Sequence, residues 1–516
     1  MKINCHIKWT TVLSIIFFSP LCLHAYDFVV DGIYYNLNSA EKTVSVTKSP
    51  NSYSGNITIP ASVIFANQQL PVIAIEESAF KTCKSLKSVE ISNSVTTIER
   101  EAFYDCSSLK SVVLPNSITI IEDFTFFGCT SLESVVIPNS VTEIGNSIFY
   151  GCSSLKSVVI PNSVTTIEGG AFYGCSSLES VDIPNSVTTI GNQTFSRCTS
   201  LKSVVISNSV TTIEHEAFSY CTSLESIVIP NSVTKIERDA FCSCTSLESV
   251  VIPNSVTEIG SNAFSVCRSL KSVVIPNSVT TIARSTFSSC SSLESVVIPN
   301  SVTEIERDAF YLCTSLESVV IPNSVTKIGS NAFDQCKSLR DLTFEDGESD
   351  LWIPNSYTFP SNIENIYLGR YISSNSGVFL FNNFTTISLG KYVDTTINIL
   401  DVKRYGNLET VYCYNPLPPK SWEFTDLQYS TVEVYVPDGA LEAYKAADVW
   451  KNFWNIKEMS ETTGIDDILE DSRDYSDYPV EIFNLSGVKV GNSKENLKPG
   501  VYIVRQGRKS EKILIR

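Results

Sequence analysis

Residues Ser246 to Cys267 read SLESVVIPNSVTEIGSNAFSVC, and variants of this stretch recur every 23 residues through the middle of the chain. The Phe-x-x-Cys motif that ends the stretch occurs twelve times in one phase between residues 80 and 336. No insertion or deletion interrupts this period. A fixed period of about 20 to 50 residues is typical of a solenoid, in which each copy forms one turn that packs on its neighbours. The sequence therefore predicts a solenoid.

One copy can be divided by the direction of its side chains. Alternate residues of an extended segment face opposite sides, so Ser249, Val251 and Pro253 are expected to point outward. Pro253 also begins a turn, because proline cannot donate to a sheet ladder. The Ala-Phe-x-x-Cys segment is expected to form a short helical turn. Eight side chains per copy are expected to point inward: Leu247, Val250, Ile252, Val256, Ile259, Ala263, Phe264 and Cys267.

The predicted fold class is a mainly β solenoid of 23-residue turns with a β cap at its start and a separate small β domain at its end. Solenoids need caps because their terminal turns would otherwise expose core and strand edges. Val449, Trp450, Phe453, Trp454 and Ile456 are expected to close the far end. The predicted segments are a signal peptide (1–25), an N-terminal β cap (26–78), the twelve-copy solenoid (79–342), divergent turns and a C-terminal cap (343–459), an acidic linker (460–477) and a β tail (478–516).

The spacing Leu-x-x-Val-x-Ile-Pro, then Val-Thr-x-Ile, then Ala-Phe-x-x-Cys resembles the BspA-like, or Treponema-type, leucine-rich repeat family. The resemblance covers residues 79 to about 342, with slight departures such as Ser92 and Ser207 in place of proline. The family implies a microbial surface protein that binds host or microbial partners.

Both ends of the chain suggest export. Lys2 and Lys8, an apolar run and Ala25 describe a secretory signal peptide, and Pro20 breaks a run already short for a membrane anchor. The three β runs after residue 478 resemble the sorting tail of type IX secretion in Bacteroidetes. We therefore expect a secreted protein on the exterior of the outer membrane, attached to it only through its C-terminal end.

Composition argues against several functions. The net charge of −17 disfavours nucleic acid. His215 is the one histidine beyond the predicted signal peptide, so no Ser-His-Asp or Cys-His site can be built without it. We expect His215 to be a variable, solvent-facing residue rather than a general base. No enzyme activity and no cofactor are expected.

Twelve of the sixteen cysteines occupy one position of the repeat. A disulfide between neighbouring turns is compatible with their expected spacing, but buried free thiols that act as small hydrophobic side chains are favoured. Their 23-residue spacing lacks the short paired spacing of a zinc site, so no metal is expected there.

A candidate binding face remains on the outward side of the predicted sheet. Its valine stripe is larger than a soluble monomer usually exposes, although strand propensity and repeat duplication could also account for it. A column of lysine and glutamate runs beside the stripe and is expected to set selectivity. The candidate concave face comprises Val136, Val159, Val205, Val228, Val251, Val274, Val297, Val320, Lys156, Glu179, Lys202, Glu225, Glu248 and Lys271.

These features favour a non-catalytic adhesion module for a protein partner, either host matrix or another microbe. The alternative is a protein that binds glycans or captures nutrients, which would present exposed aromatic platforms, and the predicted sheet face has few aromatic residues.

Overall fold

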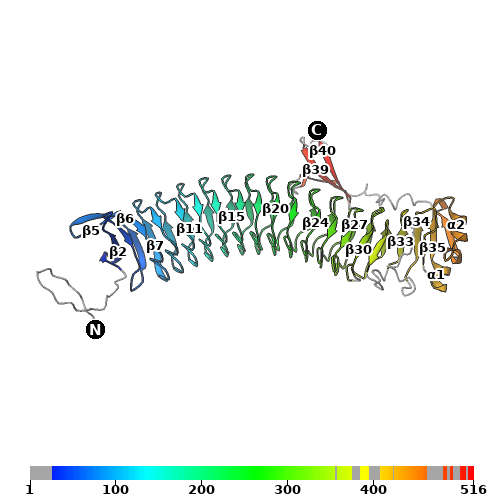
Figure 1. The fold of residues 1–516 in the computed structure, drawn as a ribbon, viewed down its shortest axis with the longest axis horizontal. Helices are drawn as coiled ribbons and strands as arrows, with labels where there is room; N and C mark the ends of the chain where they lie inside the picture. Colours follow the sequence, from blue (N-terminus) through cyan, green and yellow to red (C-terminus); the bar gives the residue numbers. More distant parts are fainter. Residues whose placement is uncertain are drawn as a thin grey trace.

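A computed structural model describes residues 26–354, 357–374, 384–393, 407–421, 423–461, 480–484, 489–491, 500–506 and 509–515. Figure 1 shows a long, gently curved rod of stacked turns. The predicted signal peptide and nearly all of the predicted acidic linker lie outside the described residues.

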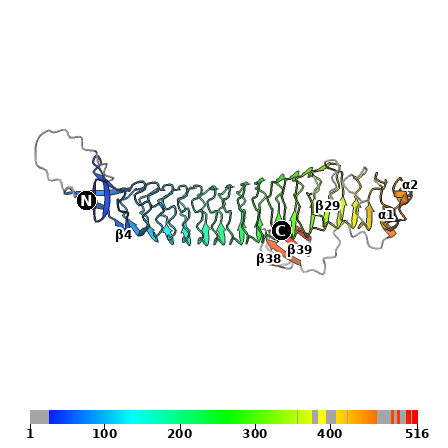
Figure 2. The ribbon, with the colours of Figure 1, turned by 90° about the horizontal axis from the view of Figure 1, so that it is seen from below.

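Each regular turn contributes one strand to each of two parallel ladders. The first strand has the sequence Ser-Val-Val in most turns, and Figure 2 shows these strands side by side along one edge of the rod. The strands of the first ladder are β7 (Ser85–Ile91), β9 (Ser111–Val113), β11 (Ser134–Val136), β13 (Ser157–Val159), β15 (Ser180–Asp182), β17 (Ser203–Val205), β19 (Ser226–Val228), β21 (Ser249–Val251), β23 (Ser272–Val274), β25 (Ser295–Val297) and β27 (Ser318–Ile321).

The second strand of each turn is only two residues long. These strands are β8 (Thr97–Ile98), β10 (Ile120–Ile121), β12 (Glu143–Ile144), β14 (Thr166–Ile167), β16 (Thr189–Ile190), β18 (Thr212–Ile213), β20 (Lys235–Ile236), β22 (Glu258–Ile259), β24 (Thr281–Ile282), β26 (Glu304–Ile305) and β28 (Lys327–Ile328). Corresponding positions of adjacent copies pair, as Glu258 does with Lys235, so the 23-residue period sets the register.

The Ala-Phe-x-x-Cys segment forms hydrogen-bonded turns rather than a helix, and it also connects neighbouring turns. Backbone N–H groups of Asn262, Phe264 and Val266 donate to carbonyl oxygens of the next turn at 2.9, 2.9 and 2.7 Å. Asn262 and Val266 lie in the left-handed region of backbone space, with φ of 57° and 62°. This conformation directs the N–H group of every second residue toward the next turn. Backbone bonds thus join successive turns on a third side.

The core is a set of columns, one for each inward position of the repeat. All eight side chains expected to point inward in the Ser246–Cys267 unit are buried, which confirms the prediction. Phenylalanine rings of successive turns stack, with centroids 5.3 Å apart for Phe241 and Phe264. Parallel stacking of identical side chains fills the same volume in every turn and makes one continuous core.

Pro253 and its equivalents contradict the predicted outward column. The chain turns at Pro253, whose carbonyl accepts the N–H of Val256 at 3.0 Å, so strand alternation ends at Val251. The prolines consequently lie away from solvent. Buried members of this column are Pro115, Pro138, Pro161, Pro230, Pro253, Pro276, Pro299 and Pro322, and Pro184 is half-buried.

The N-terminal strands lead into both ladders. They are β1 (Phe28–Val30), β2 (Ile33–Asn38), β3 (Thr43–Val46), β4 (Ser54–Ile59), β5 (Ser62–Phe65) and β6 (Gln68–Ile75). β4 pairs with β7 of the first ladder and β6 with β8 of the second. Antiparallel pairs β1–β2, β2–β3 and β5–β6 complete this end.

Beyond β28 the turns become irregular, but the first ladder continues to a seven-stranded sheet in the order β27-β29-β31-β33-β34-β35-β36. The elements here are β29 (Asp341–Phe344), β30 (Leu351–Ile353), β31 (Asn365–Leu368), β32 (Ile372–Ser374), β33 (Thr386–Leu389), β34 (Thr410–Cys413), α1 (Asp426–Thr431), β35 (Glu433–Val436), α2 (Leu441–Ala446), η1 (Trp450–Asn452), β36 (Asn455–Glu458) and η2 (Met459–Glu461).

Trp450 and Phe453 close this end from within, as expected, and the indole N–H of Trp450 donates to the Pro419 carbonyl at 2.8 Å. Trp454 is 78% exposed, so its predicted place in the core is wrong. Consecutive residues in extended backbone point to opposite sides, so Phe453 and Trp454 cannot both face the core.

The tail contains an antiparallel sheet in the order β38-β37-β39-β40. Its strands are β37 (Val480–Asn484), β38 (Lys489–Gly491), β39 (Gly500–Gln506) and β40 (Lys509–Ile515).

Candidate binding face

The outward side chains of the first ladder form one continuous surface, which we call the Ser–Val face. In β11, Ser134 and Val136 point outward while Val135 is buried between them. The pairing of Val136 with Val159 in β13 places equivalent side chains directly beside each other. Strand alternation in a fixed register therefore converts a repeated tripeptide into a serine stripe and a valine stripe.

The valine stripe is exposed along nearly its whole length. The exposed fraction is 76% for Val136 and 47% for Val320 at the far end of the candidate set. Val251 is half-buried, and Asp182 interrupts the stripe in β15. The exposed members of the candidate set are Val136, Val159, Val205, Val228, Val274, Val297 and Val320.

Charged residues beside the stripe pair with one another across turns. All six candidate residues of this column, Lys156, Glu179, Lys202, Glu225, Glu248 and Lys271, are exposed. The Lys271 ammonium lies 2.9 Å from the Glu248 carboxylate. Such exposed pairs contribute only about 0–1 kcal/mol each to stability. Because the signs are mixed, their fields partly cancel, and the face presents valine and serine more than net charge.

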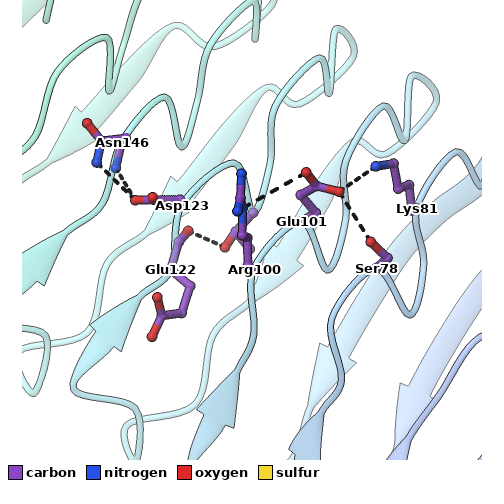
Figure 3. A network of polar contacts seen from close by, with 8 residues as sticks. Ser78, Lys81, Arg100, Glu101, Glu122, Asp123 and Asn146 are labelled. Atoms are coloured by element: carbon purple, nitrogen blue, oxygen red, sulfur yellow. Dashed lines mark hydrogen bonds and ion pairs between the residues drawn. The ribbon is translucent and has the colours of Figure 1, made fainter.

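A second polar column runs along the Ala-Phe-x-x-Cys turns. Figure 3 shows it near the N-terminal end, where Glu101 contacts Lys81, Ser78 and Arg100 of the same and the preceding turn. Lys81 is the main cause that lowers the pKa of the Glu101 carboxyl, and Ser78 and Arg100 add to the effect. These contacts join successive turns outside the core.

An aromatic ladder on these turns was not predicted from the sequence. The rings of Tyr104, Phe127, Tyr150 and Tyr173 stack in series with centroids 4.7, 4.6 and 4.3 Å apart. Each residue directly follows the core phenylalanine of its copy, so the 23-residue period could have revealed the ladder. The ring faces cover one another, and the Lys81 ammonium lies 4.7 Å from the Tyr104 centroid. Between its two ends the ladder therefore offers ring edges, rather than the open faces on which a sugar would stack.

The cysteine column is buried and its thiols are free. From Cys106 to Cys336 each thiol donates to the carbonyl oxygen of the core phenylalanine in the preceding turn, at 3.0–3.3 Å. Burial raises the pKa of the Cys198 and Cys290 thiols to about 12. A buried thiol held in the neutral form is a poor nucleophile and a poor metal ligand.

The stacked turns and the aliphatic outer face define a leucine-rich repeat scaffold, a fold typical of non-enzymatic binding proteins. The protein-family model for the BspA type leucine rich repeat region matches this sequence at residues 56–179, 165–294 and 280–400, which together exceed half of the chain. The protein belongs to the BspA-type leucine-rich repeat family, as its repeat motif predicted.

One solved bacterial structure shares the fold, and a second is similar in sequence. A leucine-rich repeat protein from Bacteroides ovatus is 30% identical with a TM-score of 0.56, and the match covers 72% of this chain and 96% of that one. A leucine rich cell surface protein from Faecalibacterium prausnitzii is 32% identical with a TM-score of 0.39, covering 61% of this chain and 93% of that one. No curated protein sequence matches this chain.

Members of the family are typically surface proteins. Among the described residues, no helix has the length and apolar character needed to cross a bilayer.

Proposed function

We propose that this protein is an exported, non-catalytic adhesion protein that holds an extended segment of a host matrix or microbial surface protein on its Ser–Val face. The exposed valine stripe carries the proposal, because soluble proteins rarely leave so long an aliphatic surface uncovered. Membership in the BspA-type family supports a role in protein interaction.

The chemistry of the face favours an apolar protein segment. Valine side chains gain free energy when an aliphatic partner removes them from water, at about 25 cal/mol per Å². The serine hydroxyls beside them can donate to or accept from polar groups of the partner. The mixed charges of the neighbouring column, including Lys156 and Glu179, would reject partners of mismatched charge pattern and so set selectivity.

Substitution within three turns can test the binding role. The variant Val228→Ser, Val274→Ser, Val297→Ser removes exposed aliphatic groups while leaving the buried columns unchanged. The matched control Thr234→Ser, Thr257→Ser, Thr280→Ser removes exposed methyl groups beside the second ladder and keeps each hydroxyl. Binding is measured against immobilised extracellular matrix proteins and, in parallel, polysaccharides.

We expect the valine variant to lose matrix-protein binding and the threonine control to retain it. Unchanged binding by the valine variant would reject the Ser–Val face and favour strand propensity as the reason for the valines. Binding to polysaccharides alone would favour the glycan alternative.

Export and attachment form a separate part of the proposal. The tail 478–516 is proposed to direct the protein through type IX secretion to the outer surface after cleavage of the leader at Ala25. A reporter fused to residues 479–516 should appear on the cell surface. Retention of that reporter in the periplasm would contradict a sorting role without affecting the binding proposal.

A further inference from the structure

One position of the polar column brings a histidine and two carboxylates together. His215 and Glu216 belong to one turn and Asp239 to the next, and one ligand atom from each lies within 4.8 Å of the others. Glu216 and Asp239 are equivalent positions in successive copies. At this position of the repeat, every other stacked pair that contains an acidic residue has Ser, Phe, Gln or Asn as its second member. Glu216 and Asp239 are therefore the one pair of stacked carboxylates at this position of the regular turns.

The hydrogen bonds orient the imidazole toward the carboxylates. His215 Nδ1 lies 3.0 Å from the Arg238 carbonyl oxygen, which can only accept, so Nδ1 carries the proton. In the neutral ring, Nε2 then has a free lone pair, and it faces Glu216 Oε1 at 3.2 Å. A histidine that binds a metal usually donates its other ring N–H to a carbonyl or carboxylate in this way.

The two carboxylates are also held by groups outside the cluster. Gln193 Nε2 donates to Glu216 Oε2 at 2.7 Å, leaving Oε1 directed at the imidazole. Arg238 Nε donates to Asp239 Oδ2 at 2.7 Å.

We infer that His215, Glu216 and Asp239 form a surface site for a divalent transition-metal ion, of the class represented by Zn²⁺. One imidazole and two carboxylates suit zinc better than calcium or magnesium, which prefer oxygen ligands alone. With metal–ligand bonds of about 2.0–2.1 Å, tetrahedral ligands lie about 3.3 Å apart, close to the Nε2–Oε1 separation. Asp239 completes the set by a small side-chain movement, and water takes the fourth position.

The site would act as a clip between two turns. Glu216 and Asp239 repel each other across the turn interface, and a bound cation would convert that repulsion into attraction. This differs from the expectation that His215 is only a solvent-facing variable residue. It does not involve the Ser–Val face, so its failure would leave the proposed function untouched.

The test is calorimetric titration of the full-length chain with Zn²⁺, after circular dichroism has shown that each variant is folded. We expect His215→Ala and Glu216→Gln each to lower the affinity of one site by about tenfold or more. The matched control is Asp308→Asn, because Arg307 and Asp308 repeat the Arg238–Asp239 pair at 3.0 Å in a turn without histidine. That variant should bind zinc as the unmodified protein does.

A second measurement distinguishes zinc bound at this site from zinc bound elsewhere, for instance by cysteines. Saturating Zn²⁺ should raise the melting temperature of the unmodified protein and of Asp308→Asn more than that of His215→Ala. The inference is overturned if the unmodified chain binds no zinc, or if His215→Ala matches it in both the number of sites and the shift in melting temperature.

Discussion

The thiol of Cys244 donates a hydrogen bond to the carbonyl oxygen of Phe218, one turn earlier, at 3.2 Å. The same oxygen accepts the backbone N–H of Cys221, also at 3.2 Å. Cysteine thus serves at this position as a small buried side chain with one weak donor, and the oxygen's second lone pair is satisfied by the neighbouring turn. The same two residues therefore contribute both core packing and a hydrogen bond between turns.

Thiol reactivity should distinguish this column from Cys242. Burial keeps the reagent away from the column thiols and raises the pKa of members such as Cys198 and Cys290, which therefore stay protonated at pH 8. Cys242 is half-buried and should be alkylated first among the described cysteines. Brief maleimide labelling followed by peptide mapping checks this, with Cys242→Ser as the control. Equal labelling of Cys198 and Cys242 in the folded protein would contradict the packing described here.

Phe218 tests the contribution of the aromatic column to stability. Its ring is fully buried and lies 5.5 Å from that of Phe195 and 5.3 Å from that of Phe241. Phe218→Ala should lower the free energy of unfolding by about 3–5 kcal/mol, because a cavity opens at two interfaces. Urea denaturation followed by circular dichroism measures the loss. Val228→Ala, an exposed control, should change it by about 0.5 kcal/mol or less. Similar losses in both variants would refute the assignment of core and surface.

Glu101 should make stability depend on pH in the acidic range. Lys81 holds the pKa of this carboxyl below its usual range, so the ionised form stabilises the folded state. That contribution is present above the unfolded pKa and is lost as pH falls through the lower, folded value. The difference in urea midpoint between the unmodified protein and Glu101→Gln should therefore be larger at pH 7 than at pH 3. A difference that stayed constant between these two pH values would argue against the contact in Figure 3.

Asp182 offers a gain-of-binding test of the Ser–Val face. It is one of two outward residues of β15 and interrupts the valine stripe between Val159 and Val205. If an apolar segment lies along the stripe, Asp182→Val should strengthen its binding by about 1 kcal/mol, roughly fivefold. Surface plasmon resonance with a matrix protein that binds the unmodified chain measures this effect. Asp182→Ser separates loss of charge from gain of aliphatic surface, and equal affinities for the Val and Ser variants would contradict a continuous apolar contact.

The 23-residue period was enough to predict the solenoid and its inward columns, and the family was predicted from the resemblance of the repeat motif. Each copy places Leu247, Val250 and Phe264, or their equivalents, at fixed intervals. Stacking every turn on its neighbour in the same way therefore buries all of these side chains. The same alternation predicted the outward valine stripe, because strand geometry alone sets which side a residue faces. The aromatic ladder follows from the same period, although it was not predicted.

Tertiary structure decided the features that depend on where a strand ends or which turns meet. Pro253 is buried because the chain turns before alternation can carry it outward, and Trp454 is exposed because Phe453 occupies the core. His215, Glu216 and Asp239 form a cluster only once the turns are stacked, because stacking places residues 23 positions apart, such as Glu216 and Asp239, next to each other. A repeat specifies the shape of one turn, whereas the variable residues acquire their partners from the turns on either side.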